Sequence, residues 1–76
     1  MLDYEKFARR LKDTLEDLGM SQSELARRII ASRFTVSRWV NAASAPCSDD
    51  LYKICEVLGV SADWLLGLSD RKERDV

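Results

Sequence analysis

Residues 32–41, with the sequence SRFTVSRWVN, bring together side chains that can read the edges of DNA base pairs. Arginine presents two parallel donors that match O6 and N7 of guanine, phenylalanine can lie against the thymine methyl group, and serine can bond a phosphate or a base edge. The segment holds Arg33 and Arg38 and no acidic residue. Since each good bidentate pair contributes about 1–3 kcal/mol of discrimination, two arginines would be enough to make a DNA half-site readable.

The same side chains also have purely structural interpretations. Arg33 and Arg38 could form only a solvated helix face. Phe34 stands two positions before Val36 and could fold back over Ile30 as a core residue. Which interpretation holds depends on the elements that position the segment.

The distribution of charge favours a localised binding face in the middle of the chain. The formal net charge of the whole chain is −1, which gives no global argument for a nucleic-acid partner. Residues 21–45, however, carry four arginines against one glutamate, whereas residues 46–69 carry four carboxylates against one lysine. Positive charge confined to one segment can still produce a local attractive field.

The first 20 residues predict an amphipathic helix. Apolar residues recur in steps of three or four from Tyr4 to Leu18, which is the spacing of one helical face. Asp3 can cap its start and Gly19 can end it.

A second helix is predicted from Ser21 by a capping box, in which Ser21 and Glu24 satisfy each other's backbone donors. Met20 and Leu25 flank the box at the spacing of a hydrophobic staple. The residues expected to point inward are Leu25, Ala26, Ile29 and, as a further candidate, Ile30.

A short break at Ala31 separates this helix from a third one, which Ser32 can cap and which runs to about Asn41. Because the break is brief, the two helices must cross at a steep angle. The apolar face of the third helix consists of Val36, Trp39 and Val40, and Trp39 is expected in the core.

Two further helices follow the loop at Pro46. Ser48 can cap the fourth, with Asp49 and Asp50 at its positive end, and its apolar stripe is Leu51, Ile54, Cys55 and Leu58 up to a stop at Gly59. Ser61 can cap a short fifth helix that ends near Gly67. In that helix, Trp64 with Leu65 is expected to close the core, with a dimer contact as the alternative for Trp64.

These elements predict an all-α fold, a compact five-helix domain over residues 1–69, with residues 70–76 as a polar tail or the start of a linker. No apolar run approaches the roughly 20 residues that span a bilayer, and the N-terminus lacks the apolar core of a signal peptide, so a cytoplasmic location is expected. The chain contains no histidine and only Cys47 and Cys55, both expected to be reduced, with Cys55 in the core. We therefore expect no metal site, no cofactor and no enzymatic activity.

The stretch from about Phe7 to Asp70 resembles the Cro and phage-repressor family of helix-turn-helix proteins, also called XRE-like. The matching pieces are RRLKDTLEDLGMSQSELARRI, SRFTVSRWVN, Pro46 and LYKICEVLGVSADWLLGLSD, in that order. The resemblance implies a transcriptional regulator that binds a double-stranded DNA operator sequence-specifically, as a homodimer, with the helix at about 32–41 in the major groove. It also makes Ala26 the small residue where the second and third helices touch, and Val36 the buried anchor of the recognition helix.

The resemblance also assigns contacts residue by residue. The base-reading positions are Ser32, Arg33, Phe34, Ser37 and Arg38. Gln22 corresponds to a phosphate contact, with a base contact as a further option, and Asn41 corresponds to a phosphate contact. Because the loop after the third helix lacks basic residues, Ser44 is a further candidate for binding phosphate.

Three departures from the family pattern carry expectations of their own. Ile30 stands where the turn usually has glycine, so either the turn is reshaped or the second helix runs one residue longer. Leu15 and Val40 stand where many members have an ion pair, so we expect these two side chains to be in contact. Residues 42–45 lack the usual basic residues, which predicts modest affinity and a shallow salt dependence.

One rival function remains open at this point. A protein-interaction module of the same fold, of the antitoxin or antirepressor type, would suit the acidic fourth helix and the hydrophobic residues Trp64, Leu65 and Leu68.

Overall fold

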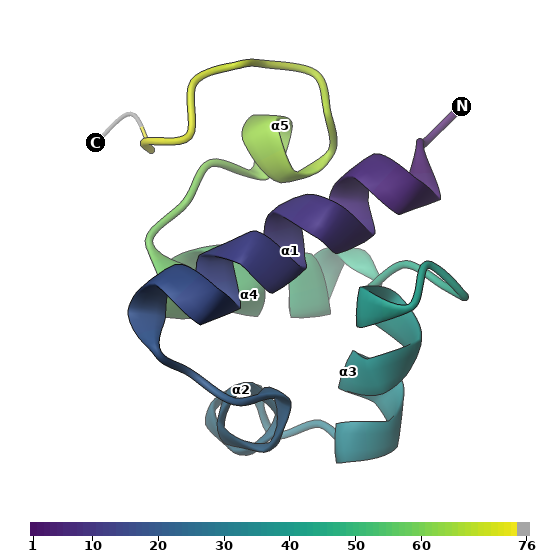
Figure 1. The fold of residues 1–76 in the computed structure, drawn as a ribbon, viewed down its shortest axis with the longest axis vertical. Coiled ribbons are helices and arrows are strands. Elements are labelled where there is room, and N and C mark those ends of the chain that lie inside the picture. The colour runs from purple at the N-terminus through teal and green to yellow at the C-terminus, as the bar shows by residue number, and fades with distance from the viewer. Residues whose placement is uncertain (75–76) are drawn as a thin grey trace.

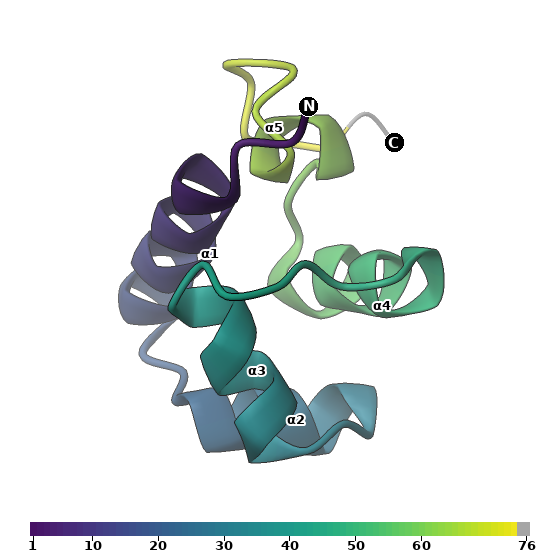
Figure 2. The same cartoon turned by 90° about the vertical axis from the view of Figure 1, so that its right-hand side faces the viewer.

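The computed structural model describes residues 1–74, and its five helices confirm the all-α fold (Figure 1). The helices are α1 (Tyr4–Leu18), α2 (Gln22–Ile29), α3 (Arg33–Val40), α4 (Ser48–Leu58) and α5 (Ala62–Leu65). Helices α2 and α3 form one end of the molecule, and α5 with the N-terminus lies at the other (Figure 2). Among the described residues, none of the helices combines the length and apolar character needed to span a bilayer.

Local capping chemistry determines where most of these helices begin. The side chains of Asp3, Ser21, Ser32 and Ser61 each accept a hydrogen bond from the backbone N–H three residues later, as the sequence predicts. Ser48 is a correction, because it is the first helical residue of α4 rather than its cap. The extended backbone of Cys47 already turns the chain into the helix there, and Cys47 makes no side-chain capping bond.

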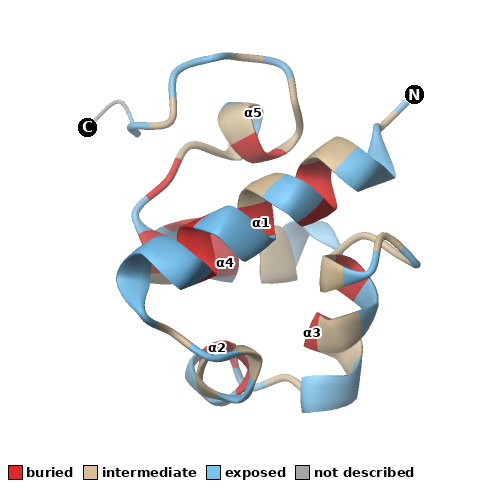
Figure 3. Cartoon of the chain, in the orientation of Figure 1, coloured by how far each residue is buried: buried red, intermediate tan, exposed pale blue. Residues whose placement is uncertain are grey.

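One hydrophobic core holds all five helices together (Figure 3). Trp39 is 2% exposed and Leu65 is fully buried, so both expected core positions are confirmed, and Trp64 packs against the core half-buried. Leu15 is a core residue and Val40 packs against the same core, but the direct contact between them stays a prediction. Both cysteines are free thiols, with Cys55 buried, as expected.

The inward orientation offered for Ile30 is wrong, and the alternative core position of Phe34 is excluded. Ile30 does not point inward but is 89% exposed, and Phe34 is not a core residue but is 72% exposed. Leu25, Ile29 and Val36, each at most 1% exposed, complete the core at this end of the molecule without a contribution from Ile30 or Phe34.

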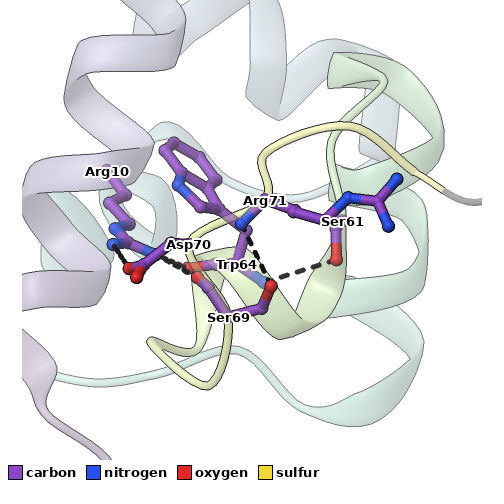
Figure 4. A network of polar contacts seen from close by, with 6 residues as sticks. All are labelled: Arg10, Ser61, Trp64, Ser69, Asp70 and Arg71. Carbon is purple, nitrogen blue, oxygen red and sulfur yellow. Dashed lines mark hydrogen bonds and ion pairs between the residues drawn. The ribbon is translucent and has the colours of Figure 1, made fainter.

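Residues 69–74, which we call the C-terminal segment, pack against the helical body (Figure 4). The N–H of Ser61 donates to the carbonyl of Lys72 at 2.8 Å, and Val60 forms an isolated antiparallel bridge with Glu73. The guanidinium of Arg74 donates to the carbonyl of Cys55 at 3.2 Å. The division of the chain into a domain at residues 1–69 and a tail at 70–76 stays a prediction. Within the predicted tail, Lys72, Glu73 and Arg74 make the contacts with the helical body described above.

Arg10 of α1 also joins the C-terminal segment to the body. Its guanidinium donates to the carbonyl of Trp64 and, at 2.9 Å, to that of Ser69, and it lies 3.7 Å from a carboxylate oxygen of Asp70. It also stands 4.8 Å from the centre of the Trp64 ring, and the Lys72 ammonium stands 5.2 Å from that centre. Both distances are in the range of cation–π attraction.

Candidate nucleic-acid interface

The turn between α2 and α3 has the geometry of a Schellman motif with isoleucine at its left-handed position. The N–H of Ala31 donates to the carbonyl of Ala26 at 2.8 Å, and the N–H of Ile30 donates to that of Arg27 at 3.3 Å. Ile30 itself has φ 58° and ψ 54°. Both expectations for this turn are therefore wrong, because the turn is not reshaped and α2 is not longer.

The physical reason lies in the hydrogen bonds that close the motif. They need a residue with positive φ after the helix, and the crossing of α2 and α3 needs the short turn that the motif provides. The left-handed conformation costs an L-residue roughly 1–2 kcal/mol. Ile30 is 89% exposed, so no buried apolar area of its side chain offsets that cost.

Ala26 and Val36 have the burial expected of residues that hold the two helices together. They are 3% and 0% exposed, respectively, and both belong to the core. The opposite side of α3 is left to solvent, and this places part of the predicted reading surface there.

The two arginines of α3 are exposed and electrostatically uncompensated. Within residues 1–74, no hydrogen bond or ion pair engages the guanidinium group of Arg33 or Arg38. Arg28 of α2 differs, because it forms an ion pair with Glu24 at 2.8 Å, one helical turn away. Arg33 and Arg38 on α3, like the exposed Arg27 of α2, thus keep their full charge for a partner.

The serines at base-reading positions already have partners inside the protein. The hydroxyl of Ser32 accepts from the N–H of Thr35 at 3.0 Å and shares a hydrogen bond with the Thr35 hydroxyl at 2.8 Å. Ser37 is half-buried and accepts from the side-chain amide of Asn41 at 3.2 Å. Each serine can offer only its remaining hydrogen-bonding capacity, so the arginines and Phe34 are the more available groups.

The predicted phosphate contacts lie on different elements. Gln22 is the first residue of α2, Asn41 ends α3, and Ser44 lies half-buried in the following loop. Asn41 also borders a surface depression formed with residues 1–5, which include Asp3 and Glu5. The carboxylates of Asp3 and Glu5 would oppose a phosphate that approached this depression.

Two contributors were missed from the sequence. Thr35 fixes the hydroxyl of Ser32, and its position three residues after a cap could have indicated this. Lys53 of α4 places its ammonium 3.5 Å from the carbonyl of Ile29 and so brings a further cation to the α2–α3 turn. Lys53 and Ile29 are 24 positions apart in the sequence, and no local pattern connects them.

Burial raises the pKa of the Cys55 thiol above its ordinary value, and the nearby Arg74 guanidinium partly opposes this. The thiol is therefore a neutral core group. It lies on α4, whereas the predicted reading surface lies on α3.

Comparison with known proteins agrees with this geometry. Residues 11–65 match the helix-turn-helix family. The chain is 34% identical over 61 residues to an uncharacterized HTH-type transcriptional regulator of Haemophilus influenzae, covering 80% of the chain and 25% of the relative. It is 31% identical over 70 residues to the 26 kDa repressor protein of Escherichia phage HK022, covering 87% of the chain and 30% of that protein.

Among solved structures, the chain is similar to the crystal structure of apo-HppE. The TM-score is 0.73 at 32% sequence identity, over 82% of this chain and 35% of that one. The chain thus spans between a quarter and about a third of the length of these relatives.

Proposed function

Because the chain belongs to the helix-turn-helix family, we propose that it is the reading domain of a phage-repressor-like transcriptional regulator and binds double-stranded DNA sequence-specifically. One observation carries this proposal, namely the exposure of Arg33 and Arg38 on α3 without any compensating carboxylate. Residues 25–48 contain no acidic residue, so no carboxylate of this segment itself would repel the phosphate backbone.

In the proposed complex, α3 and its flanking residues, about 32–41, lie in the major groove. Arg33 and Arg38 each donate two hydrogen bonds to a guanine, and Phe34 packs on a thymine methyl group. Ser32 and Ser37 use their remaining capacity on base edges or phosphates. Gln22, Asn41 and Ser44 bind phosphates, which fix the register of α3 without carrying sequence information.

The regulator is proposed to act as a homodimer on a two-fold-related operator. One α3 helix offers few base contacts, and two half-sites together provide the specificity that a regulator needs. The two recognition helices would then lie roughly 34–36 Å apart, one turn of DNA. Since the target is DNA, a cytoplasmic location follows, and no enzymatic role is proposed.

Selection of bound sequences from random duplex DNA, followed by affinity measurements on the selected site, tests the proposal. We expect guanines at fixed positions and two half-sites separated by one DNA turn. Arg33→Ala and Arg38→Ala should each weaken binding by about 1–3 kcal/mol and relax the preference at one position.

Arg28→Ala is the matched control, since it removes the same charge from an arginine already paired with Glu24. It should leave the sequence preference unchanged. If no preferred DNA emerges at low salt, and if the Arg33→Ala, Arg38→Ala double variant behaves like the parent, the proposal is wrong and a protein-interaction module takes its place.

A further inference from the structure

The fold requires a left-handed residue at position 30, but it does not explain why that residue is an exposed isoleucine. Its φ of 58° lies in the left-handed region, where a β-branched residue is strained. Its side chain is 89% exposed and therefore contributes little buried apolar area in return. Glycine would close the same turn without strain. A strained residue at a functional turn points to a role outside the fold.

Other turns of the molecule make Ile30 stand out. The same pair of backbone hydrogen bonds closes the chain after α1, α3 and α5, with Gly19, Ala42 and Gly67 at the left-handed position. Two of these residues are glycines, and Ala42 carries only a methyl group. Ile30 alone among these four positions combines positive φ with a large aliphatic side chain.

The surroundings of Ile30 indicate what it contacts. The turn leads within two residues to Ser32, the cap of α3, so Ile30 lies at the end of the molecule where α3 begins (Figures 1 and 2). Phe34, 72% exposed, lies in the first turn of α3. Residues 25–48 carry four arginines and no carboxylate, which complements a polyanion. An aliphatic side chain in such surroundings fits the one apolar group that the major groove displays, the C5-methyl of thymine.

We propose that Ile30 is a specificity-determining residue whose side chain contacts a thymine methyl group beside the position read by Phe34. This inference rests on the proposed DNA binding and adds a residue of the turn to the reading surface of α3. It gives the strained isoleucine a function that the glycine usual at this position could not perform.

The test uses the duplex obtained by selection with the unchanged chain. Each thymine of that duplex is replaced in turn by deoxyuridine, which removes the methyl group and preserves base pairing. The unchanged chain should lose about fourfold in affinity for each contacted methyl, the value of one buried carbon. In the Ile30→Gly variant one of these thymine positions should become insensitive to the replacement, and affinity for the thymine duplex should fall by a similar factor. In the Phe34→Ala variant, a different thymine position should become insensitive to the replacement.

Ala42→Gly is the matched control, because it relieves the same kind of left-handed backbone strain at the turn that ends α3. Its thymine dependence should equal that of the unchanged chain. Thermal melting of both variants shows whether they remain folded, and both should melt no lower than the parent.

The inference is overturned if Ile30→Gly keeps the full thymine-to-uracil effect at every position, or if it binds the thymine duplex as tightly as the parent. Such results with a clear selected sequence leave the proposed function intact and remove only the role of Ile30. A selection that yields no sequence, with Arg33→Ala and Arg38→Ala without effect, removes both.

Discussion

Replacing Arg10 should destabilise the domain far more than replacing its neighbour Arg9. The Arg10 side chain is only 19% exposed and joins α1 to the carbonyls of Trp64 and Ser69, whereas Arg9 is exposed on the same helix. Arg10→Ala leaves both carbonyls without this donor and removes the cation from the Trp64 ring.

The magnitude follows from the separate contacts. A hydrogen bond from a charged donor contributes about 1.5–3 kcal/mol, and a partly desolvated cation–π contact about 1 kcal/mol. The ion pair with the fully exposed Asp70 adds little, because surface pairs contribute about 0–1 kcal/mol. Since such contributions are not additive, we expect Arg10→Ala to lower the free energy of unfolding by about 2–4 kcal/mol. For a domain of this size that corresponds to a fall in Tm of at least about 8 °C.

Urea denaturation followed by circular dichroism measures this free energy. Arg9→Ala should change it by less than about 0.5 kcal/mol. Arg10→Met retains most of the aliphatic stem and separates packing from hydrogen bonding, and it should still cost more than half of the alanine effect. If Arg10→Ala costs no more than Arg9→Ala, the C-terminal segment is not held to the body by this side chain and the reasoning fails.

Three further outcomes are expected. Ile30→Gly and Ala42→Gly should each raise the free energy of unfolding, measured by urea denaturation, by about 0.5–1 kcal/mol. The reason is that glycine relieves about 1–2 kcal/mol of left-handed strain, which exceeds the cost of the entropy that it adds to the unfolded chain. A loss of stability in both variants would contradict the assigned turn geometry. Iodoacetamide at pH 8 should alkylate the exposed Cys47 readily and Cys55 only on unfolding. Burial raises the pKa of the Cys55 thiol and so reduces the fraction present as the reactive thiolate. Equal alkylation rates of the two cysteines, measured by mass spectrometry, would refute this. DNA affinity should fall only shallowly with salt concentration, since residues 42–45 carry no cation; a slope near about −10 in a plot of log affinity against log salt would show many more phosphate contacts than proposed.

The helix boundaries could be predicted because their causes are local. A side chain that caps a helix bonds a backbone N–H three residues away, so Asp3, Ser21, Ser32 and Ser61 carry their signal within one turn of sequence. Ser48 shows the limit of this reasoning. A residue of the right type stands near the start of α4, but the preceding backbone at Cys47 had already begun the helix.

The reading surface could be predicted only in part. Arginine and phenylalanine on one helix indicate which residue types a groove would need, and charge counts along the chain showed where positive charge is concentrated. The exposure of Phe34 depends on how residues of other helices close the core. The hydrogen bonds of Ser32 and Ser37 are local, but the residue types alone do not show that these hydroxyls are already engaged.

The sequence by itself determined the all-α class, the order of the helices, the caps of α1, α2, α3 and α5, and the segment that carries the arginines. Periodicity, capping and charge act over a few residues, so they can be recognised directly in the amino-acid sequence. Only the tertiary structure decided that Ile30 is left-handed and exposed, that Lys53 reaches the end of α2, and that Arg10 holds the C-terminal segment. These features depend on segments distant in sequence, or on a helix crossing that imposes a conformation against local preference.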